Sequence, residues 1–253
     1  MSEEAKVWTA ALLVIGDEIL SGRTQDLNVA QVARWLNDEG IRLREVRIVA
    51  DDIGQIARSV NALRGAHDYL FTTGGIGPTH DDITVDAIAE AFGVPVVVHP
   101  QARAILEEYY ASRGGVNEAR LRMARVPQGA ELIANPLSGA PGIRMGNVHI
   151  LAGVPSIAAR MLEALTGKLE GGRPVVSVAV GAFAAESDVA ELLRTVQDDH
   201  PGVAIGSYPF AKDGRFGANF VIRCESGEQA ADCAGELARK LAEAGFEAIE
   251  GGI

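Results

Sequence analysis

The sequence predicts an α/β fold with three αβα layers around a mostly parallel sheet, followed by a second, smaller α+β domain. Three observations support this. Short apolar runs alternate with amphipathic stretches through the first two thirds of the chain, as in doubly wound sheets. The segment Gly171-Gly172-Arg173-Pro174 then breaks the alternation. The remaining residues mix strands and helices within the length of a small domain. The predicted domains span 1–170 and 174–253.

Each expected strand is an apolar run, and each expected helix repeats apolar residues every three or four positions. In the first domain, strands are expected at 9–15, 41–49, 68–73 and 94–98, with further strand signals at 144–152 around a turn at Gly146-Asn147. Helices are expected there at 28–39, 52–63, 83–92, 101–113, 117–125 and 157–165. In the second domain, strands are expected at 175–180, 203–208 and 218–224, and helices at 186–198 and 228–244.

The composition excludes several classes of protein. A hydrophobic fraction of 47% and a charged fraction of 23% over 253 residues are those of a globular protein. No apolar run reaches the ~18 residues of a membrane helix, and Met1-Ser2-Glu3-Glu4 lacks the basic region of a signal peptide. We therefore expect a cytoplasmic protein without a membrane partner. The net charge of −11 argues against nucleic acid as a partner. Cys224 and Cys233 are expected to fill the core.

The segment 72–84 is the most informative part of the chain, because three glycines and two carboxylates lie between an expected strand and an expected helix. The glycines let the backbone approach a ligand, and the helix N-terminus offers free N–H groups to an anion. Adjacent Asp81 and Asp82 would repel a bare phosphate, so a divalent metal or a water is expected to bridge them to phosphate oxygens. Alternatively, one of these aspartates only caps the helix.

Three other loops are expected at the same edge, because ligands of doubly wound sheets gather at the carboxyl ends of the strands. They are 16–18, 51–52 and 135–142. Each alone has an ordinary explanation as a turn, a helix cap or a surface loop. Together they predict metal-assisted chemistry on a phosphate-bearing ligand. His80 is either a general base or an exposed loop residue. The run before Ile157 either contacts phosphate or simply begins a helix with Pro155 and a capping Ser156.

Four motifs resemble the molybdopterin-binding family that includes MoaB and MogA. Within that family, the motifs are more similar to the CinA amino-terminal group and to the amino-terminal domain of eukaryotic FAD synthases. The motifs are Gly16-Asp17-Glu18 with Asp26 and Asn28, Val49-Ala50-Asp51-Asp52, the run 73–82, and Ala140-Pro141-Gly142 with Gly153-Val154-Pro155. The resemblance covers residues 9–166. Residues from 174 resemble the small KH-like domain of CinA. We expect no nicotinamide mononucleotide deamidation, since the resemblance does not include the CinA deamidase domain.

The resemblance implies a metal-dependent nucleotide pyrophosphatase acting on ADP-ribose or FAD, with Mg, Mn or Co as cofactor. It implies a nucleotide or a pterin-phosphate as ligand and a homo-oligomer, either a dimer or a trimer. The implied catalytic residues are Asp51, His80 and Asp82, and the implied metal ligands are Asp17, Asp81 and Asp82. The implied ligand-binding residues are Gly74, Gly75, Gly77, Pro78, Thr79, Ser138, Gly139, Ala140, Pro141, Gly142 and Pro155.

Two departures from the family pattern support a second hypothesis. Ser138-Gly139 stands where the family has Gly-Thr, and Ile157 stands where the family has Glu. If that Glu helps to hold a metal or a water, its loss slows or removes hydrolysis. The alternative prediction is a non-hydrolytic molybdopterin- or nucleotide-binding protein linked to molybdenum cofactor metabolism.

Overall fold

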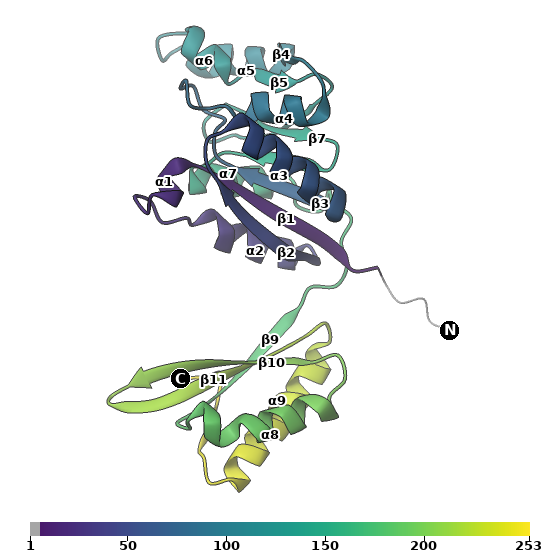
Figure 1. Cartoon of the computed structure of the whole chain (residues 1–253), viewed down its shortest axis with the longest axis vertical. Coiled ribbons are helices and arrows are strands. Elements are labelled where there is room, and N and C mark those ends of the chain that lie inside the picture. The colour runs from purple at the N-terminus through teal and green to yellow at the C-terminus, as the bar shows by residue number, and fades with distance from the viewer. Residues whose placement is uncertain (1–5) are drawn as a thin grey trace. The chain divides into compact units, whose positions relative to one another are not determined.

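The chain divides into two compact units, Met1–Gly172 and Arg173–Ile253 (Figure 1). The computed structural model describes residues 6–253. The acidic run Met1-Ser2-Glu3-Glu4, on which the signal-peptide prediction rests, lies outside the described residues. Among residues 6–253, no helix is both long enough and apolar enough to cross a membrane.

A six-stranded sheet forms the middle layer of the first unit, in the order β2-β1-β3-β8-β7-β6. Its strands are β1 (Trp8–Ile15), β2 (Ile41–Val49), β3 (Tyr69–Thr73), β6 (Glu131–Ile133), β7 (Gly142–Met145) and β8 (Val148–Leu151). The pairs of β1 with β2, β1 with β3, and β3 with β8 are parallel, while β7 and β6 continue the sheet antiparallel. The predicted mostly parallel sheet is confirmed, and the turn expected at Gly146-Asn147 joins β7 to β8.

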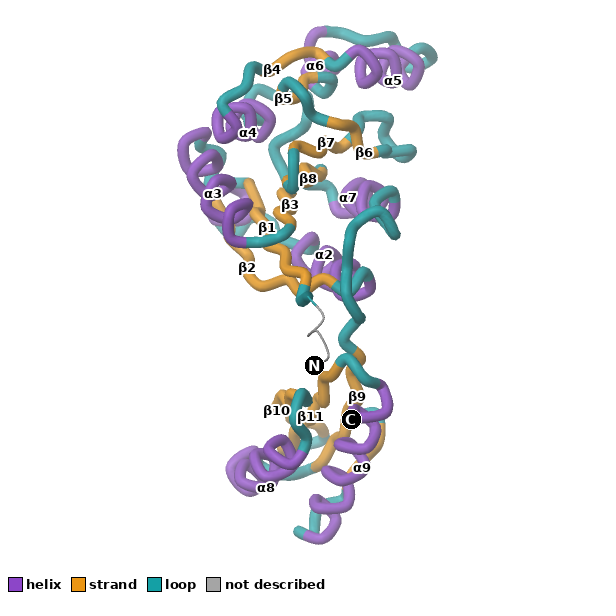
Figure 2. The backbone as a smooth tube through the Cα atoms, turned by 90° about the vertical axis from the view of Figure 1, so that its right-hand side faces the viewer, coloured by secondary structure: helices purple, strands orange, loops and turns teal. Residues whose placement is uncertain are grey.

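Helices cover both faces of this sheet (Figure 2). On one face lie α3 (Ile53–Ala66) and α4 (Thr84–Phe92), and on the other lie α2 (Asn28–Asp38) and α7 (Pro155–Glu163). Side chains of β1 alternate between the two cores, with Leu13 facing α3 and α4 and Leu12 facing α2 and α7. Because β1 is buried on both faces, its sequence is a continuous apolar run.

A small subdomain carries α5 (Pro100–Tyr110), α6 (Glu118–Arg122) and a two-stranded sheet of β4 (Val96–Val98) and β5 (Arg125–Pro127). The strand expected at 94–98 exists, but it pairs with β5 and not with the central sheet. The helix expected at 117–125 was too long. It ends at Arg122 because Arg125 already pairs with Val98 and forms an ion pair with Asp86.

The second unit is an antiparallel sheet in the order β10-β11-β9-β12, packed against two helices. Its elements are β9 (Val176–Ala182), α8 (Glu186–Asp199), β10 (Ala204–Lys212), β11 (Arg215–Cys224), α9 (Gly227–Glu243) and β12 (Ala248–Glu250). The predicted small α+β unit is confirmed. The strands expected at 203–208 and 218–224 extend toward each other into one long hairpin. Cys224 and Cys233 are free, buried core residues, as expected.

Candidate functional site

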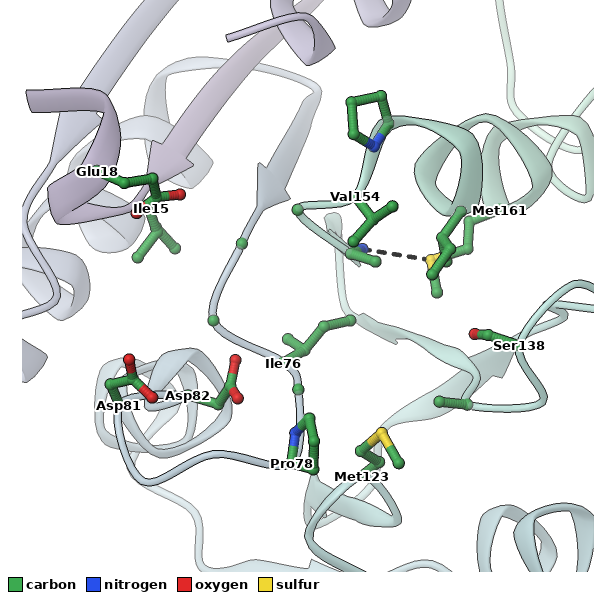
Figure 3. A pocket seen from close by; sticks show the side chains of 18 of the residues that line it. Ile15, Glu18, Ile76, Pro78, Asp81, Asp82, Met123, Ser138, Val154 and Met161 are labelled. Atoms are coloured by element: carbon green, nitrogen blue, oxygen red, sulfur yellow. Dashed lines mark hydrogen bonds between the residues drawn. The ribbon is translucent and has the colours of Figure 1, made fainter. Parts of the chain in front are cut away.

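A cavity of about 660 Å³ opens in the first unit where β1 and β3 end. Figure 3 shows Asp81, Asp82 and Glu18 on one side of it, and Val154, Met161 and Ser138 on the other. Its lining residues are Ile15, Glu18, Thr24, Gly74, Gly75, Ile76, Gly77, Pro78, Asp81, Asp82, Tyr110, Met123, Ser138, Ala140, Ala152, Gly153, Val154, Pro155, Ile157 and Met161. The loops after β1 and β3, the 135–142 loop and the start of α7 therefore converge on one site.

The glycine loop is held against the start of α4 by Thr84. Its buried hydroxyl donates to the Gly74 carbonyl at 2.9 Å, and its backbone N–H donates to the Gly75 carbonyl at 3.0 Å. Gly75 has a φ of 66°, and a Cβ added there would lie 2.2 Å from the Thr84 hydroxyl oxygen. Only glycine therefore fits this turn, and the loop backbone itself forms part of the cavity wall.

Neither Asp81 nor Asp82 caps α4, so that structural alternative is wrong. The N-cap residue is Ile83, which makes no side-chain capping bond. The Asp82 carboxylate instead accepts hydrogen bonds from the Thr79 backbone N–H at 2.7 Å and from the Thr79 hydroxyl. Thr79 thus shapes the loop from outside the cavity lining, while Asp82 orders the turn and also faces the cavity.

Asp51 belongs to a group of mutually repelling carboxylates. Its Oδ2 atom accepts a hydrogen bond from the Asp17 backbone N–H at 2.9 Å, which ties the segment after β2 to the start of α1 (Asp17–Leu20), the short helix after β1. Partial burial raises the pKa of Asp51, and the charges of Asp17, Glu18 and Asp81 raise it further. The adjacent Asp52 has a different role, because its carboxylate caps α3 by accepting from the Gln55 N–H at 2.7 Å.

The cluster of carboxylates around Asp51 has the chemistry to bind a divalent metal. Hard cations prefer oxygen ligands, and a cation would relieve the repulsion at Asp51. Over residues 6–253, no three side chains of His, Cys, Asp or Glu lie close enough to hold a metal by themselves. The predicted ligands Asp17, Asp81 and Asp82 are therefore not preassembled, and Asp17 does not line the cavity. Because Mg²⁺ commonly binds one or two carboxylates plus substrate phosphates, these residues fit a metal bound together with its substrate.

His80 projects into solvent, with its side chain 99% exposed. Its Nδ1 atom lies 4.0 Å from an Asp81 carboxylate oxygen. Interactions with Thr79 and with its own backbone N–H lower the pKa of Asp81, and His80 lowers it further. In this conformation His80 does not line the cavity, so its role as a general base stays a prediction.

The 135–142 loop is organised by buried Asn135. Its side-chain amide donates to the Ser138 hydroxyl at 2.6 Å and to the Ala140 carbonyl at 2.7 Å. Ser138 and Ala140, two of the predicted ligand-binding residues, line the cavity. Three other predicted residues do not: Gly139 lies against the Tyr109 ring, Pro141 faces a small separate cavity, and Gly142 is buried in β7.

Sequence reasoning missed several residues of the site. Arg122 lines a small cavity behind the glycine loop, and its Nη2 atom donates to the Asp82 carbonyl at 3.5 Å. It places a positive charge beside the carboxylate turn. Met123, Met161 and Tyr110 line the apolar side of the main cavity. Their sequence signals are those of ordinary core residues. The buried hydroxyls of Thr72 and Thr73, at the end of β3, have no hydrogen-bond partner within the described residues.

Comparisons with known proteins agree with this architecture. The model of the probable molybdopterin binding domain matches residues 11–171, and that of the FAD synthase middle domain matches residues 174–250. A probable FAD synthase of Caenorhabditis elegans is 33% identical over 245 residues, covering 87% of this chain and 47% of the relative. A protein of Aeropyrum pernix is 35% identical over 219 residues, covering 83% of this chain and 81% of the relative.

A CinA-like protein of Geobacter metallireducens is 40% identical over 158 residues, covering 60% of this chain and 38% of the relative. The chain thus spans about half the length of the FAD synthase relative, and less of the CinA-like one. Among solved structures, the CinA protein of Thermoplasma acidophilum is 32% identical with a TM-score of 0.59, covering 63% of this chain and 98% of that chain. The chain belongs to the probable molybdopterin binding domain family, with CinA-like proteins and FAD synthases among its relatives.

Proposed function

We propose that the first unit binds a nucleotide with a diphosphate bond in the 660 Å³ cavity and hydrolyses that bond with a divalent metal. ADP-ribose and FAD are the proposed substrates. One observation carries the proposal: in a single cavity, the glycine loop runs between the carboxylates of Glu18, Asp81 and Asp82 on one side and a largely apolar wall on the other. The volume falls within the range of small-molecule sites.

One side of the cavity suits the heterocycle of such a ligand, and the other suits its phosphates. The apolar side chains of Met123, Met161 and Tyr110 offer a surface for a flat heterocycle, and methionine sulfur contacts aromatic rings favourably. The backbone of 74–78 offers the close approach that phosphate oxygens need. The ligand would therefore lie across the cavity with its phosphates toward Asp81 and Asp82.

The carboxylates have distinct proposed roles. Asp81 and Asp82 would hold the metal and, through it, the phosphate end of the ligand, and Glu18 would orient the attacking water from the segment after β1. Asp51 anchors the Asp17 N–H and so fixes the position of Glu18. When bound, the divalent cation neutralises phosphate charge and polarises the bond that is cleaved.

The experiment measures hydrolysis of ADP-ribose and FAD with Mg, Mn or Co in the wild type, Glu18→Gln, Asp81→Asn and Asp52→Asn. The control Asp52→Asn makes the same chemical change as Asp81→Asn at a carboxylate that caps α3, and asparagine also caps helices well. We expect the Glu18 and Asp81 variants to lose about 100-fold or more in kcat, with the control unchanged. Wild-type turnover in both variants, or no turnover of either compound with any of the three metals, would refute hydrolysis at this site.

A second candidate function is binding without hydrolysis, as part of molybdenum cofactor metabolism. Ile157 favours it, because this apolar side chain lines the cavity in the first turn of α7, where the family pattern has Glu. In that case the wild type is inactive, the same nucleotides raise its Tm, and Ile157→Glu gains turnover. Turnover by the wild type would rule out this second function.

A further inference from the structure

A second cavity, of about 390 Å³, lies at the other end of the parallel strands in the first unit. It is formed where β3 and β8 begin, whereas the glycine loop follows the end of β3. Its lining residues are Tyr69, Arg144, Gly146, Asn147, His149, Lys168, Leu169 and Glu170. None of them lines the 660 Å³ cavity, so the two sites are separate.

His149 lines this second cavity and is only 1% exposed. Its ring stacks on Phe71, with centroids 4.9 Å apart, and meets Tyr69 edge-on at 6.0 Å. Neither ring nitrogen makes a hydrogen bond of normal geometry within the described chain, although weaker interactions with the backbone of Asn147 and Leu70 raise the pKa of His149. A buried polar group without a partner costs about 1–3 kcal/mol, and native proteins rarely leave one unpaired. The folded chain therefore leaves both ring nitrogens short of a well-formed hydrogen bond.

The groups around His149 offer mostly hydrogen-bond donors. Arg144 on β7 pairs directly with His149 on β8, and Lys168 faces the same cavity. Arg144 lies 3.6 Å from Glu131, and Lys168 forms no ion pair with any residue in 6–253. Glu170 also lines the cavity, and its backbone N–H and carbonyl hold the Tyr69 hydroxyl.

The side-chain nitrogen of Asn147 is already engaged. It donates to the backbone carbonyls of Arg64, His67 and Asp68. Beside the single carboxylate of Glu170, the cavity therefore presents two cationic side chains and the imidazole, which suit a ligand with acceptor oxygens. A small oxyanion meets this requirement, and Tyr69 and Leu169 leave room for an apolar substituent on it.

We propose that this cavity is a second binding site, for a phosphate-type oxyanion held by His149, Arg144 and Lys168. The oxyanion is either inorganic phosphate or the phosphoryl group of a monoester. The proposal does not depend on hydrolysis at the glycine loop.

Burial, with a smaller effect of Arg144, lowers the pKa of His149 to about 4 when no ligand is bound. A bound anion favours the charged imidazolium and raises this pKa. The other charged side chains that face this cavity are Arg144, Lys168 and Glu170. Anion affinity should therefore rise as the pH falls. Sulfate is the probe for this measurement, because unlike phosphate it does not titrate between pH 6 and 8.

The experiment is calorimetric titration of the full chain with inorganic phosphate, phenyl phosphate and sulfate. The variants are His149→Phe, which keeps the ring stack, and Lys168→Gln. Lys212→Gln, an exposed lysine of the second unit, is the matched control. We expect both cavity variants to lose at least tenfold in affinity, with the control unchanged. Tighter binding of phenyl phosphate than of phosphate would identify a monoester as the ligand, and the reverse would identify phosphate.

Urea unfolding shows whether a variant has lost anion binding or has failed to fold. His149→Phe removes two unpaired nitrogens, so without ligand it should unfold at the same or higher urea concentration than the wild type. Phosphate should raise the midpoint of the wild type only. An anion held at the glycine loop would be unaffected by His149→Phe, so unchanged affinity in that variant overturns the proposal. Absence of wild-type binding to all three probes also overturns it.

Discussion

Replacing Gly75 by Ala is expected to destabilise the first unit far more than the same change at Gly93. Both glycines have a φ of 66°, and they lie on either side of α4. A Cβ at Gly93 meets nothing within 4 Å, whereas a Cβ at Gly75 would lie 2.2 Å from the Thr84 hydroxyl oxygen. The two variants share the conformational cost and differ in this one contact.

The expected loss in the free energy of unfolding is the sum of a backbone cost and the cost of disturbing Thr84. An alanine in the left-handed region costs about 1–2 kcal/mol, and this is the whole cost at Gly93. At Gly75 the Thr84 hydroxyl must also move away from the Gly74 carbonyl, and it leaves a buried bond of 2.9 Å unmade. That adds about 1–3 kcal/mol. We therefore expect Gly75→Ala to lose about 2–5 kcal/mol in total.

Urea unfolding followed by tryptophan fluorescence measures this difference. Trp8 and Trp35 are the only tryptophans of the chain, and both lie in the first unit. The same preparations are titrated with ADP-ribose, whose affinity should fall in Gly75→Ala and persist in Gly93→Ala. Equal free energies of unfolding for the two variants would refute the argument that Thr84 fixes the glycine loop.

Three further predictions concern charge and chemistry. Because the folded-state pKa of Asp51 is raised, its ionisation costs stability above the pKa of the unfolded chain. Asp51→Asn should therefore raise the free energy of unfolding at pH 7, and the gain should be lost as the pH falls below 3.8, the ordinary pKa of this carboxyl group. An equal gain at pH 7 and at about pH 3 would contradict the assignment. Mg²⁺ with ADP-ribose should raise the Tm of the wild type more than that of Asp81→Asn. Removal of the metal with a chelator should abolish this difference in Tm. A difference that survives the chelator would count against a metal at Asp81. Burial raises the pKa of Cys233 to about 11, so iodoacetamide at pH 8 should label this thiol only in urea, which mass spectrometry detects; labelling in the native protein would disprove its burial.

The central sheet and its helices could be predicted because their apolar patterns are long and end clearly. β1 is a run of eight residues, and α2 and α3 show regular spacing. The strands β5, β6 and β12 have three residues each, too few for a period to be recognised. Nor does the pattern of β4 reveal its partner, which is set by tertiary pairing with β5.

Residues that line the cavity could be proposed from the sequence where they lie in the segment between β3 and α4, but not where distant segments meet. The glycines of 74–77 have a clear sequence signal, and they line the cavity. Asp82 and Asp52 have similar signals as possible caps, but only Asp52 caps a helix, because Thr79 bonds to Asp82. Met123 and Tyr110 reach the cavity through the packing of distant segments, which no local pattern reveals.

The nucleotide site is tested most directly by calorimetric titration of ADP-ribose and FAD, without a divalent metal so that neither is hydrolysed, into the wild type, Val154→Trp and Val98→Trp. Val154 and Val98 are both exposed valines, but only Val154 lines the cavity. We expect the wild type and Val98→Trp to bind at least one of the nucleotides equally well. Val154→Trp, whose indole fills the cavity, should bind it at least tenfold more weakly. Equal affinity in all three proteins, or no binding to the wild type, would contradict the claim that this cavity is the nucleotide site.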